Sequence, residues 1–408
     1  MITMEQLALK GGKPVRAKSK SFPLYRTIGK EEKKAVARVM DSGMLSNYIG
    51  VWDKDFYGGP EVKSFERAWE KKFKVKHAVA MNSATSALIA AVGALGIKPG
   101  DEIIVSPYTM VASVSCVLWW GGKPVFADIE PEYFCLDPKS VEAAITPRTK
   151  AIITIDLFGG VSDIDALRAI AKRHRLKIIE DAAQAPGATY KKKNAGTFGD
   201  IGVYSLNFHK QIHTGEGGVA VTNNDRLAER LQLIRNHAEA VVEDKGVKED
   251  YALIGQNYRM TELQAAIGRE QLKKLDTFIS QRQKNCRYIA ERCQDMPGIR
   301  PARTRTGSTH AHYNQSFLFD EKVVGIPRNR FIEAVEAEIP AELGRGYVKP
   351  IYRMPFIGRK PGLCPVTERL HEKELIGNEL MHANMKKKDL DDVVEAFHKV
   401  YRHREELA

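Results

Sequence analysis

Two short apolar runs flank a lysine in the middle of this chain. They are Gly202-Val203-Tyr204-Ser205-Leu206 before Lys210, and Val219-Ala220-Val221-Thr222 after it. A glycine cluster, Thr214-Gly215-Glu216-Gly217-Gly218, leads into the second run. Such runs are typical of short buried strands. An earlier apolar run, residues 176 to 179, leads into Glu180-Asp181. The sequence therefore predicts a lysine between two strands and an acid at the end of a third.

A lysine and a strand-end acid in this order suit Schiff-base chemistry with pyridoxal phosphate. The amine of Lys210 would hold the aldehyde of the cofactor, and Asp181 would keep the pyridine nitrogen protonated, so that the ring withdraws electrons. Ser83-Ala84-Thr85-Ser86 opens a predicted helix, where backbone amides and hydroxyls bind anions. Each feature alone has a plainer explanation: a surface lysine, a loop acid and an ordinary helix N-cap. Their combined order, together with the hydroxyl of Ser205, is what indicates a cofactor site.

Helix-like and strand-like segments alternate from Asn82 to Thr222, which predicts an α/β domain with a mostly parallel sheet. Ligands of such sheets bind beyond the carboxyl ends of the strands, where Asp181 falls. We expect strands at 102–106, 124–127, 151–158 and 177–180, and helices at 83–95, 113–120, 164–174, 225–240, from 261 past 282, and 389–404 with Asp389 as the N-cap.

The length of 408 residues exceeds one typical core, so two domains are expected. We predict an N-terminal arm at 1–30, a large cofactor-binding domain at 31–270 and a smaller α/β domain at 271–408. Residues 1–14 lack the apolar core of a signal peptide, and no apolar stretch is long enough for a membrane span. A cytoplasmic protein that binds no membrane is therefore expected.

Composition and motifs argue against several other classes of protein. The net charge of +12 suits anionic ligands, but no nucleic-acid recognition module is visible. Five scattered cysteines indicate neither a disulfide framework nor a metal site. His209 and His213 are four residues apart, but Lys210 stands where the zincin pattern needs a glutamate, so no metal is expected. The glycine cluster does not match the dinucleotide-binding pattern GxGxxG. The phosphate-loop signature of nucleoside triphosphatases, GxxxxGK(S/T), is absent as well.

Several motifs together resemble one enzyme family. They are Asn82-Ser83-Ala84-Thr85-Ser86-Ala87-Leu88, Glu180-Asp181-Ala182-Ala183-Gln184, Ser205 through Lys210 to Gly218, Arg235-Asn236-His237 and Asn257-Tyr258-Arg259-Met260-Thr261-Glu262. The chain resembles the sugar aminotransferases of the DegT/DnrJ/EryC1/StrS family. These are pyridoxal-phosphate enzymes of fold type I, the aspartate aminotransferase fold. The likeness runs from Gly43 to about Gln271 and is weaker beyond it.

The resemblance implies roles for individual residues. Lys210 would bind the cofactor and move a proton between cofactor and substrate, while Asp181 would pair with the ring nitrogen. Gln184 would lie near the ring oxygen. The phosphate would be held by Ala84, Thr85 and Ser205, and Asn236 would reach a phosphate in the neighbouring subunit. This last role follows from the family's homodimers, whose active sites are shared between subunits.

The chain also departs from the family pattern. Met110 follows Thr109 where an aromatic ring usually covers the cofactor, so either Met110 or Tyr108 is expected to stack on it. Asp156 replaces a family histidine. On the substrate side we expect Tyr57, which follows an inserted stretch at about 48–55, and Tyr347 and Tyr352, which lie in a stretch that carries histidine in relatives. The Gly-Gly-Pro version of the motif at 57–60 resembles the branch that acts on keto-cyclitols.

We therefore expect an aminotransferase. It would take the amino group from glutamate or glutamine, pass through the pyridoxamine form of the cofactor, and deliver the group to a nucleotide-linked keto-sugar or to a keto-cyclitol. One alternative is a sugar dehydratase, but relatives with that activity carry histidine where Lys210 stands. A second alternative is a non-catalytic regulatory protein on the same fold.

Overall fold

A seven-stranded sheet forms the centre of the computed structural model, which describes residues 6–246 and 253–408. The strand order is β1-β9-β8-β5-β4-β2-β3. Its strands are β1 (His77–Met81), β2 (Glu102–Val105), β3 (Lys123–Phe126), β4 (Thr149–Ile155), β5 (Lys177–Asp181), β8 (Ile201–Ser205) and β9 (Gly218–Thr222). All neighbouring pairs from β8 to β3 are parallel, whereas β9 is antiparallel to both β8 and β1. The expected mostly parallel sheet is confirmed.

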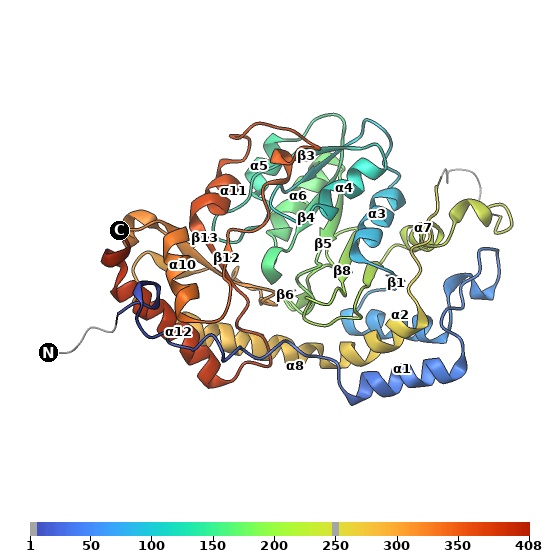
Figure 1. Ribbon diagram of the computed structural model, residues 1–408. Coiled ribbons are helices and arrows are strands. Elements are labelled where there is room, and N and C mark those ends of the chain that lie inside the picture. The colour runs from blue at the N-terminus through green and yellow to red at the C-terminus, as the bar shows by residue number, and fades with distance from the viewer. Residues whose placement is uncertain (1–5, 247–252) are drawn as a thin grey trace.

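Helices cover both faces of this sheet (Figure 1). Alternate residues of β4 serve opposite faces: Ile153 packs in one core cluster, while Ile152 packs in the other. The cluster with Ile153 contains α3 (Ala84–Ala94), α4 (Ala112–Trp119) and α7 (Asp225–Arg235). The cluster with Ile152 contains α2 (Pro60–Phe73), α5 (Pro138–Ala143), α6 (Ile164–His174) and the first half of α8 (Glu262–Arg292). A sheet that is buried on both faces explains the continuous apolar strands of the sequence.

A second, smaller sheet lies near the C-terminus. It is antiparallel with the order β10-β11-β13-β12. Its strands are β10 (Ile299–Pro301), β11 (Gln315–Phe319), β13 (Leu375–Asn378) and β12 (Gly344–Arg345), and α9 (Glu321–Val324), α10 (Arg328–Glu338), α11 (Pro365–Arg369) and α12 (Lys387–Arg402) accompany them. The remaining elements are α1 (Lys30–Ser42), which packs on α8, and a hairpin of β6 (Thr189–Tyr190) and β7 (Lys193–Asn194).

The long helix α8 joins the two parts of the molecule along its base (Figure 1). It runs unbroken through residue 270, where the sequence placed a domain change. The two parts therefore share a helix and do not meet at a flexible linker. The division at residue 270 and the arm at 1–30, of which residues 1–5 lie outside the described part, stay predictions.

Two predicted element boundaries are wrong. The helix expected at 225–240 ends at Arg235, because Asn236 leaves helical geometry and a separate short turn follows at Ala238–Ala240. Asp389 is not the N-cap of the last helix, since α12 begins at Lys387. Asp389 instead accepts a hydrogen bond from the Lys386 backbone amide at 2.9 Å, as the third residue of a capping box does.

A buried ion pair fixes the N-terminal segment to the smaller part. Lys399 Nζ lies 2.9 Å from Glu338 Oε2, and both side chains are fully buried. Glu338 also accepts hydrogen bonds from the backbone amides of Ala8 at 2.7 Å and Val15 at 3.1 Å. Lys399 donates to the Lys13 carbonyl at 2.7 Å. One carboxylate and one ammonium therefore connect α10, α12 and the segment that precedes α1.

We expect Lys399→Met to lower the free energy of unfolding by about 3–5 kcal/mol, because the Glu338 carboxylate would stay buried without its cation. Urea unfolding followed by circular dichroism measures this. Lys388→Met is the matched control: its ion pair with Asp392 is exposed on the lysine side, so the same substitution should change stability by about 0.5 kcal/mol or less. Equal losses in the two variants would contradict the buried-pair argument.

No helix within the described ranges is long and apolar enough to cross a bilayer.

Candidate active site

Lys210 lies in the turn between β8 and β9, at the edge where the parallel strands end. Its side chain is buried, and its Nζ lies 4.2 Å from the centroid of the Tyr313 ring. Burial lowers the pKa of Lys210 to about 8, although the negative charges of Asp181 and Glu379 act to raise it. Near neutral pH a useful fraction of this amine is therefore unprotonated, which is the form that attacks a carbonyl carbon. Tyr313 was not anticipated, since a lone tyrosine in a loop carries no sequence signal.

This depressed pKa has a consequence for the stability of the cofactor-free protein. A lysine whose pKa is lower in the folded than in the unfolded state destabilises the fold below pH 8, and the penalty disappears as the pH rises to about 10.5. We expect cofactor-free Lys210→Met to exceed the wild type in unfolding free energy at pH 7, by up to about 3 kcal/mol. The advantage should shrink toward pH 10 in urea titrations. A pH-independent difference would contradict the burial of a charged amine.

Asp181 ends β5 and is held by two donors. Ser113 Oγ, at the start of α4, donates to Asp181 Oδ2 at 2.7 Å, and the Ala183 amide donates to Oδ1 at 3.2 Å. Burial raises the pKa of Asp181, whereas the hydrogen bond from Ser113 and the charge of Lys210 lower it. The hydroxyls of Ser113 and Thr109 also form a hydrogen bond, with 2.9 Å between their oxygens. The sequence predicted the carboxylate but missed Ser113, because a serine in a helical segment looks like any other small residue.

Behind Asp181 lies a second buried carboxyl group, Asp156. The backbone amide of Asp156 donates to the Asp181 carbonyl at 3.0 Å. Its Oδ1 accepts two hydrogen bonds from Ser162 at 3.0 Å, while Oδ2 is buried without a partner within the described residues. Burial raises the pKa of Asp156 to about 7, with a further contribution from the charge of Asp181. A proton on Oδ2 would keep this group neutral beside Asp181.

The three residues predicted to hold a phosphate belong to adjacent elements. Ser205 is the register partner of Gly218. A Cβ atom on Gly218 would lie 2.4 Å from the backbone nitrogen of Ala84, so only glycine allows β9 to pass this close to the start of α3. Ser83 caps α3 by accepting from the Ser86 amide at 3.0 Å, and the amides of Ala84 and Thr85 are first-turn donors without an acceptor inside the helix. Helix amides and the Ser205 hydroxyl therefore form one donor set suited to a phosphate.

Gln184 connects this edge of the large sheet to the smaller part. Its Oε1 accepts from the Phe158 amide at 2.7 Å, and its Nε2 donates to the Tyr347 hydroxyl at 3.0 Å. The Tyr347 ring packs edge-to-face against Tyr108 at 5.7 Å and against Phe158 at 5.1 Å. Tyr108 is completely buried. The Tyr347 hydroxyl is thus positioned by Gln184, and a substrate role for Tyr347 stays a prediction.

Asn236 does not reach outward from this chain. It is fully buried, and its Nδ2 donates to the carbonyls of Ile49 at 2.8 Å and Phe56 at 2.9 Å. Its Oδ1 accepts from Arg259 at 2.9 Å. Within this chain the whole amide fixes the loop that carries Ile49 and Phe56, and the expected contact of Asn236 with a neighbouring subunit's phosphate stays a prediction.

Tyr352 does not face the site either. It is fully buried, its ring packs against Phe126 at 5.7 Å, and its hydroxyl bonds with Glu368. Its aromatic ring fills the core of this chain, and a substrate role for Tyr352 stays a prediction.

Tyr57 lines a pocket at the surface, and Met110 has an exposed side chain. Tyr57 lines a surface pocket with His77 and Asp225, which lie at the ends of β1 and β9 opposite to Gly218. The Met110 side chain is 51% exposed, just before α4. A substrate role for Tyr57 and a stacking role for Met110 stay predictions.

The groups present fit pyridoxal phosphate. A buried amine with a lowered pKa, a buried carboxyl group and a set of phosphate donors lie at one sheet edge, and the close approach at Gly218 brings the donors together. Lys210 would hold the aldehyde carbon, Asp181 the ring nitrogen, and Ala84, Thr85 and Ser205 the phosphate.

Comparison with known proteins points the same way. The chain is 34% identical to the L-glutamine:2-deoxy-scyllo-inosose aminotransferase of Streptomyces kanamyceticus, with 99% of this chain and 98% of the relative covered. It superposes on DesI, solved in the presence of its TDP-sugar product, with a TM-score of 0.85 at 29% identity over 99% and 98% of the two chains. The E. coli GDP-4-keto-6-deoxy-D-mannose-3-dehydratase with bound hydrated PLP gives a TM-score of 0.81 at 28% identity over 92% and 99%.

These likenesses confirm fold type I and dependence on pyridoxal phosphate. The model of the DegT/DnrJ/EryC1/StrS aminotransferase family matches residues 26–398. The chain therefore belongs to this family and is a pyridoxal-phosphate-dependent sugar aminotransferase.

Proposed function

We propose that this enzyme moves an amino group from glutamate or glutamine to the ketone of a keto-cyclitol or of a nucleotide-linked keto-sugar. The observation that carries the proposal is the buried Lys210 amine, 4.2 Å from the Tyr313 ring and within the electrostatic influence of Asp181. Bound pyridoxal phosphate supplies an electron sink, which stabilises negative charge at the substrate carbon. Both half-reactions then need a single group that moves a proton at that carbon.

Lys210 is suited to be this group because its amine is neutral in part at physiological pH. Asp181 holds the positive charge at the ring nitrogen, and Ser113 keeps its carboxylate in place. Tyr347 and Tyr313 close the side of the pocket toward the smaller sheet and help to exclude water from the amine. The Lys210 amine, the Asp181 carboxylate and the two tyrosines together support amino transfer.

The test is a screen of acceptors. The pyridoxamine form of the enzyme is mixed with keto-inositols and with 3-keto or 4-keto sugar nucleotides, and the amino product is identified by mass spectrometry. We expect conversion of at least one of these compounds, with the cofactor spectrum returning to the pyridoxal form. A free keto-cyclitol is the first candidate, since the relative from Streptomyces kanamyceticus is named for such an acceptor. Failure of both classes would contradict the proposal.

The presence of Lys210 favours amino transfer over dehydration. A dehydratase on this fold superposes on the chain, so the fold alone does not decide. A lysine supplies the amine that binds the aldehyde and returns the proton, whereas histidine at this position cannot form that bond. Addition of glutamate or glutamine to the purified enzyme should change its visible spectrum. Absence of a change with both donors would favour the regulatory alternative.

We also propose a homodimer whose active sites are shared between two copies of this chain. Several large apolar side chains are exposed in the single chain, as at a surface that another copy covers: Met44, Leu45, Met110, Trp119, Phe208 and Ile254. Phe208, two residues before Lys210, is 55% exposed. Phe208→Glu should shift the molecular mass in light scattering from dimer to monomer. A monomeric wild type would overturn this assembly.

The proposed enzyme works in the cytoplasm, as its sequence suggests. Its five cysteines are all buried and unpaired, which supports a compartment that keeps thiols reduced.

A further inference from the structure

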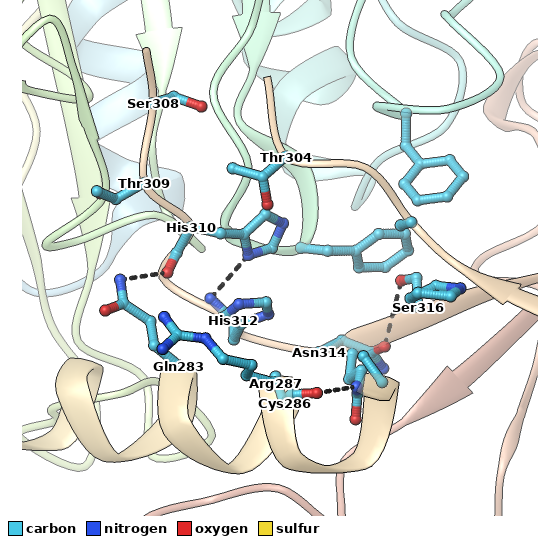
Figure 2. Close-up of a pocket in the computed structure, with 16 residues that line it drawn as sticks. Gln283, Cys286, Arg287, Thr304, Ser308, Thr309, His310, His312, Asn314 and Ser316 are labelled. Atoms are coloured by element: carbon cyan, nitrogen blue, oxygen red, sulfur yellow. Dashed lines mark hydrogen bonds between the residues drawn. The ribbon is translucent and has the colours of Figure 1, made fainter. Parts of the chain in front are cut away.

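A cavity lies behind the wall that Tyr313 forms over Lys210. It has a volume of about 370 Å³ and is bounded by α8, by the extended segment at 301–316 and by two phenylalanine rings (Figure 2). Its volume is in the range of small-molecule sites. The polar residues that face it are Gln283, Arg287, Thr304, His310, His312 and Ser316. None of the established features of the active site uses these side chains, and we call this space the rear cavity.

The polar groups of the rear cavity include donors that lack an internal partner. Arg287 lines the cavity, is exposed like Lys284, and has neither a hydrogen-bond nor an ion-pair partner within the part of the chain that the structure describes. His310 Nδ1 accepts from the His312 amide at 3.0 Å, so the neutral ring carries its proton on Nε2 and offers a donor there. Burial lowers the pKa of His310 to about 4, which keeps this tautomer at physiological pH.

Negative charge is missing from this wall. No aspartate or glutamate belongs to the described lining of the cavity. A further positive charge lies on the same helix: Arg282, five residues before Arg287, donates to the His312 carbonyl at 2.9 Å. Burial lowers the pKa of His312, and the charges of His310 and Arg282 lower it further. A donor-rich pocket with unpaired positive charge attracts an anion.

The other surfaces of the cavity suit a polyol. Thr304, Ser308, Asn314 and Ser316 present hydroxyl and amide groups (Figure 2). The rings of Phe134 and Phe158 also line the cavity and provide apolar surface. Apolar rings facing a few placed polar groups are typical of sites that bind the C–H face and the hydroxyls of a sugar. We propose that the rear cavity binds a phosphorylated monosaccharide, with its phosphate at Arg287.

The rear cavity shares its front wall with the active site. His312 and Asn314 line the cavity, while Tyr313 between them covers Lys210. The Tyr313 amide donates to the Phe158 carbonyl at 2.8 Å, and the Phe158 ring, which also lines the cavity, contacts Tyr347 at 5.1 Å. Phe158 occupies the left-handed region with φ 57°, so its position depends on these contacts. A ligand in the rear cavity would therefore influence the positions of Tyr313 and Tyr347.

The experiment is calorimetric titration of the cofactor-loaded enzyme with glucose 1-phosphate, with glucose and inorganic phosphate as reference ligands. We expect glucose 1-phosphate to bind more tightly than either reference. Arg287→Gln should weaken its binding roughly 10-fold or more, as loss of a charged hydrogen bond does. Lys284→Gln is the matched control, because Lys284 is exposed on the same helix but does not line the cavity. Its affinity should stay within about twofold of the wild type.

Three outcomes would overturn the site. They are equal affinities of Arg287→Gln and wild type, equal losses in Arg287→Gln and Lys284→Gln, and binding of inorganic phosphate as tight as that of the sugar phosphate. Arg287→Gln should lose affinity for glucose 1-phosphate but keep the wild-type aminotransferase turnover at saturating substrate, since Arg287 lies outside the Lys210 site. Thr304→Val gives a second, uncharged probe and should weaken glucose 1-phosphate without affecting inorganic phosphate.

Discussion

Lys210→Ala will abolish turnover while leaving the cofactor bound. The alanine has no amine to hold the aldehyde or to move the substrate proton, so we expect turnover to fall by roughly 10⁴-fold or more. The phosphate donors at Ala84, Thr85 and Ser205 and the carboxylate of Asp181 remain, so the variant should still retain cofactor on gel filtration. Borohydride should fix the cofactor covalently to the wild-type chain but not to this variant, as seen by intact mass.

The control for this experiment lies on the same turn. His209→Ala removes a neighbouring exposed side chain without touching the buried amine, and it should keep covalent trapping at full stoichiometry. Measurable transamination by Lys210→Ala, with purity confirmed by mass, would remove Lys210 from its central role.

Asp181→Asn will retain covalent attachment at Lys210 but lose most of the activity. An amide carries no negative charge, so it does not hold a proton on the ring nitrogen, and the ring then withdraws electrons poorly. Loss of one placed electrostatic group typically costs about 10²–10³-fold in rate. The measurement is single-turnover conversion with glutamate or glutamine, followed by the cofactor spectrum.

Ser113→Ala tests the hydrogen bond to Asp181 independently of the charge of Asp181. It keeps the carboxylate but removes the 2.7 Å hydrogen bond, which should cost about 1 kcal/mol, or less than about tenfold in rate. Because this bond lowers the pKa of Asp181, its loss should also move the acid limb of the pH–rate profile to higher pH. Equal activity of Asp181→Asn and wild type would sink the assignment of the ring-nitrogen partner.

The sequence predicted the half of the site that is attached to the large sheet. Asp181 and Lys210 could be found because each stands beside an apolar strand in the sequence. The end of a strand in a parallel sheet fixes where the residues next to it lie. Ser113 and Tyr313 could not be found, because their roles depend on which segments fold against those strand ends. The expected parallel sheet and the helices at 164–174 and around 83–95 follow from periodicity for the same reason.

Two assignments that remain predictions share a physical feature, the burial of their side chains within this chain. Asn236 and Tyr352 stand in motifs that look like recognition segments, but their polar atoms are consumed inside the chain, by Ile49, Phe56, Arg259 and Glu368. Burial of a polar side chain depends on the tertiary fold and leaves no periodic trace in the sequence. The motif therefore located the segment correctly, whereas the direction of the side chain came only from the structure.

The arrangement of the two sheets has a consequence for redesign. The groups predicted to hold the cofactor stand on the large sheet, while Tyr313, Tyr347 and Glu379, which line one pocket, come from loops of the small one. Hydrogen bonds from Gln184 to Tyr347 and from Tyr313 to Phe158 connect the two sets. We therefore expect that segments of the small sheet can be exchanged between relatives if these two hydrogen bonds are retained. Such exchanges would offer new acceptors of the amino group while the residues on the large sheet stay unchanged.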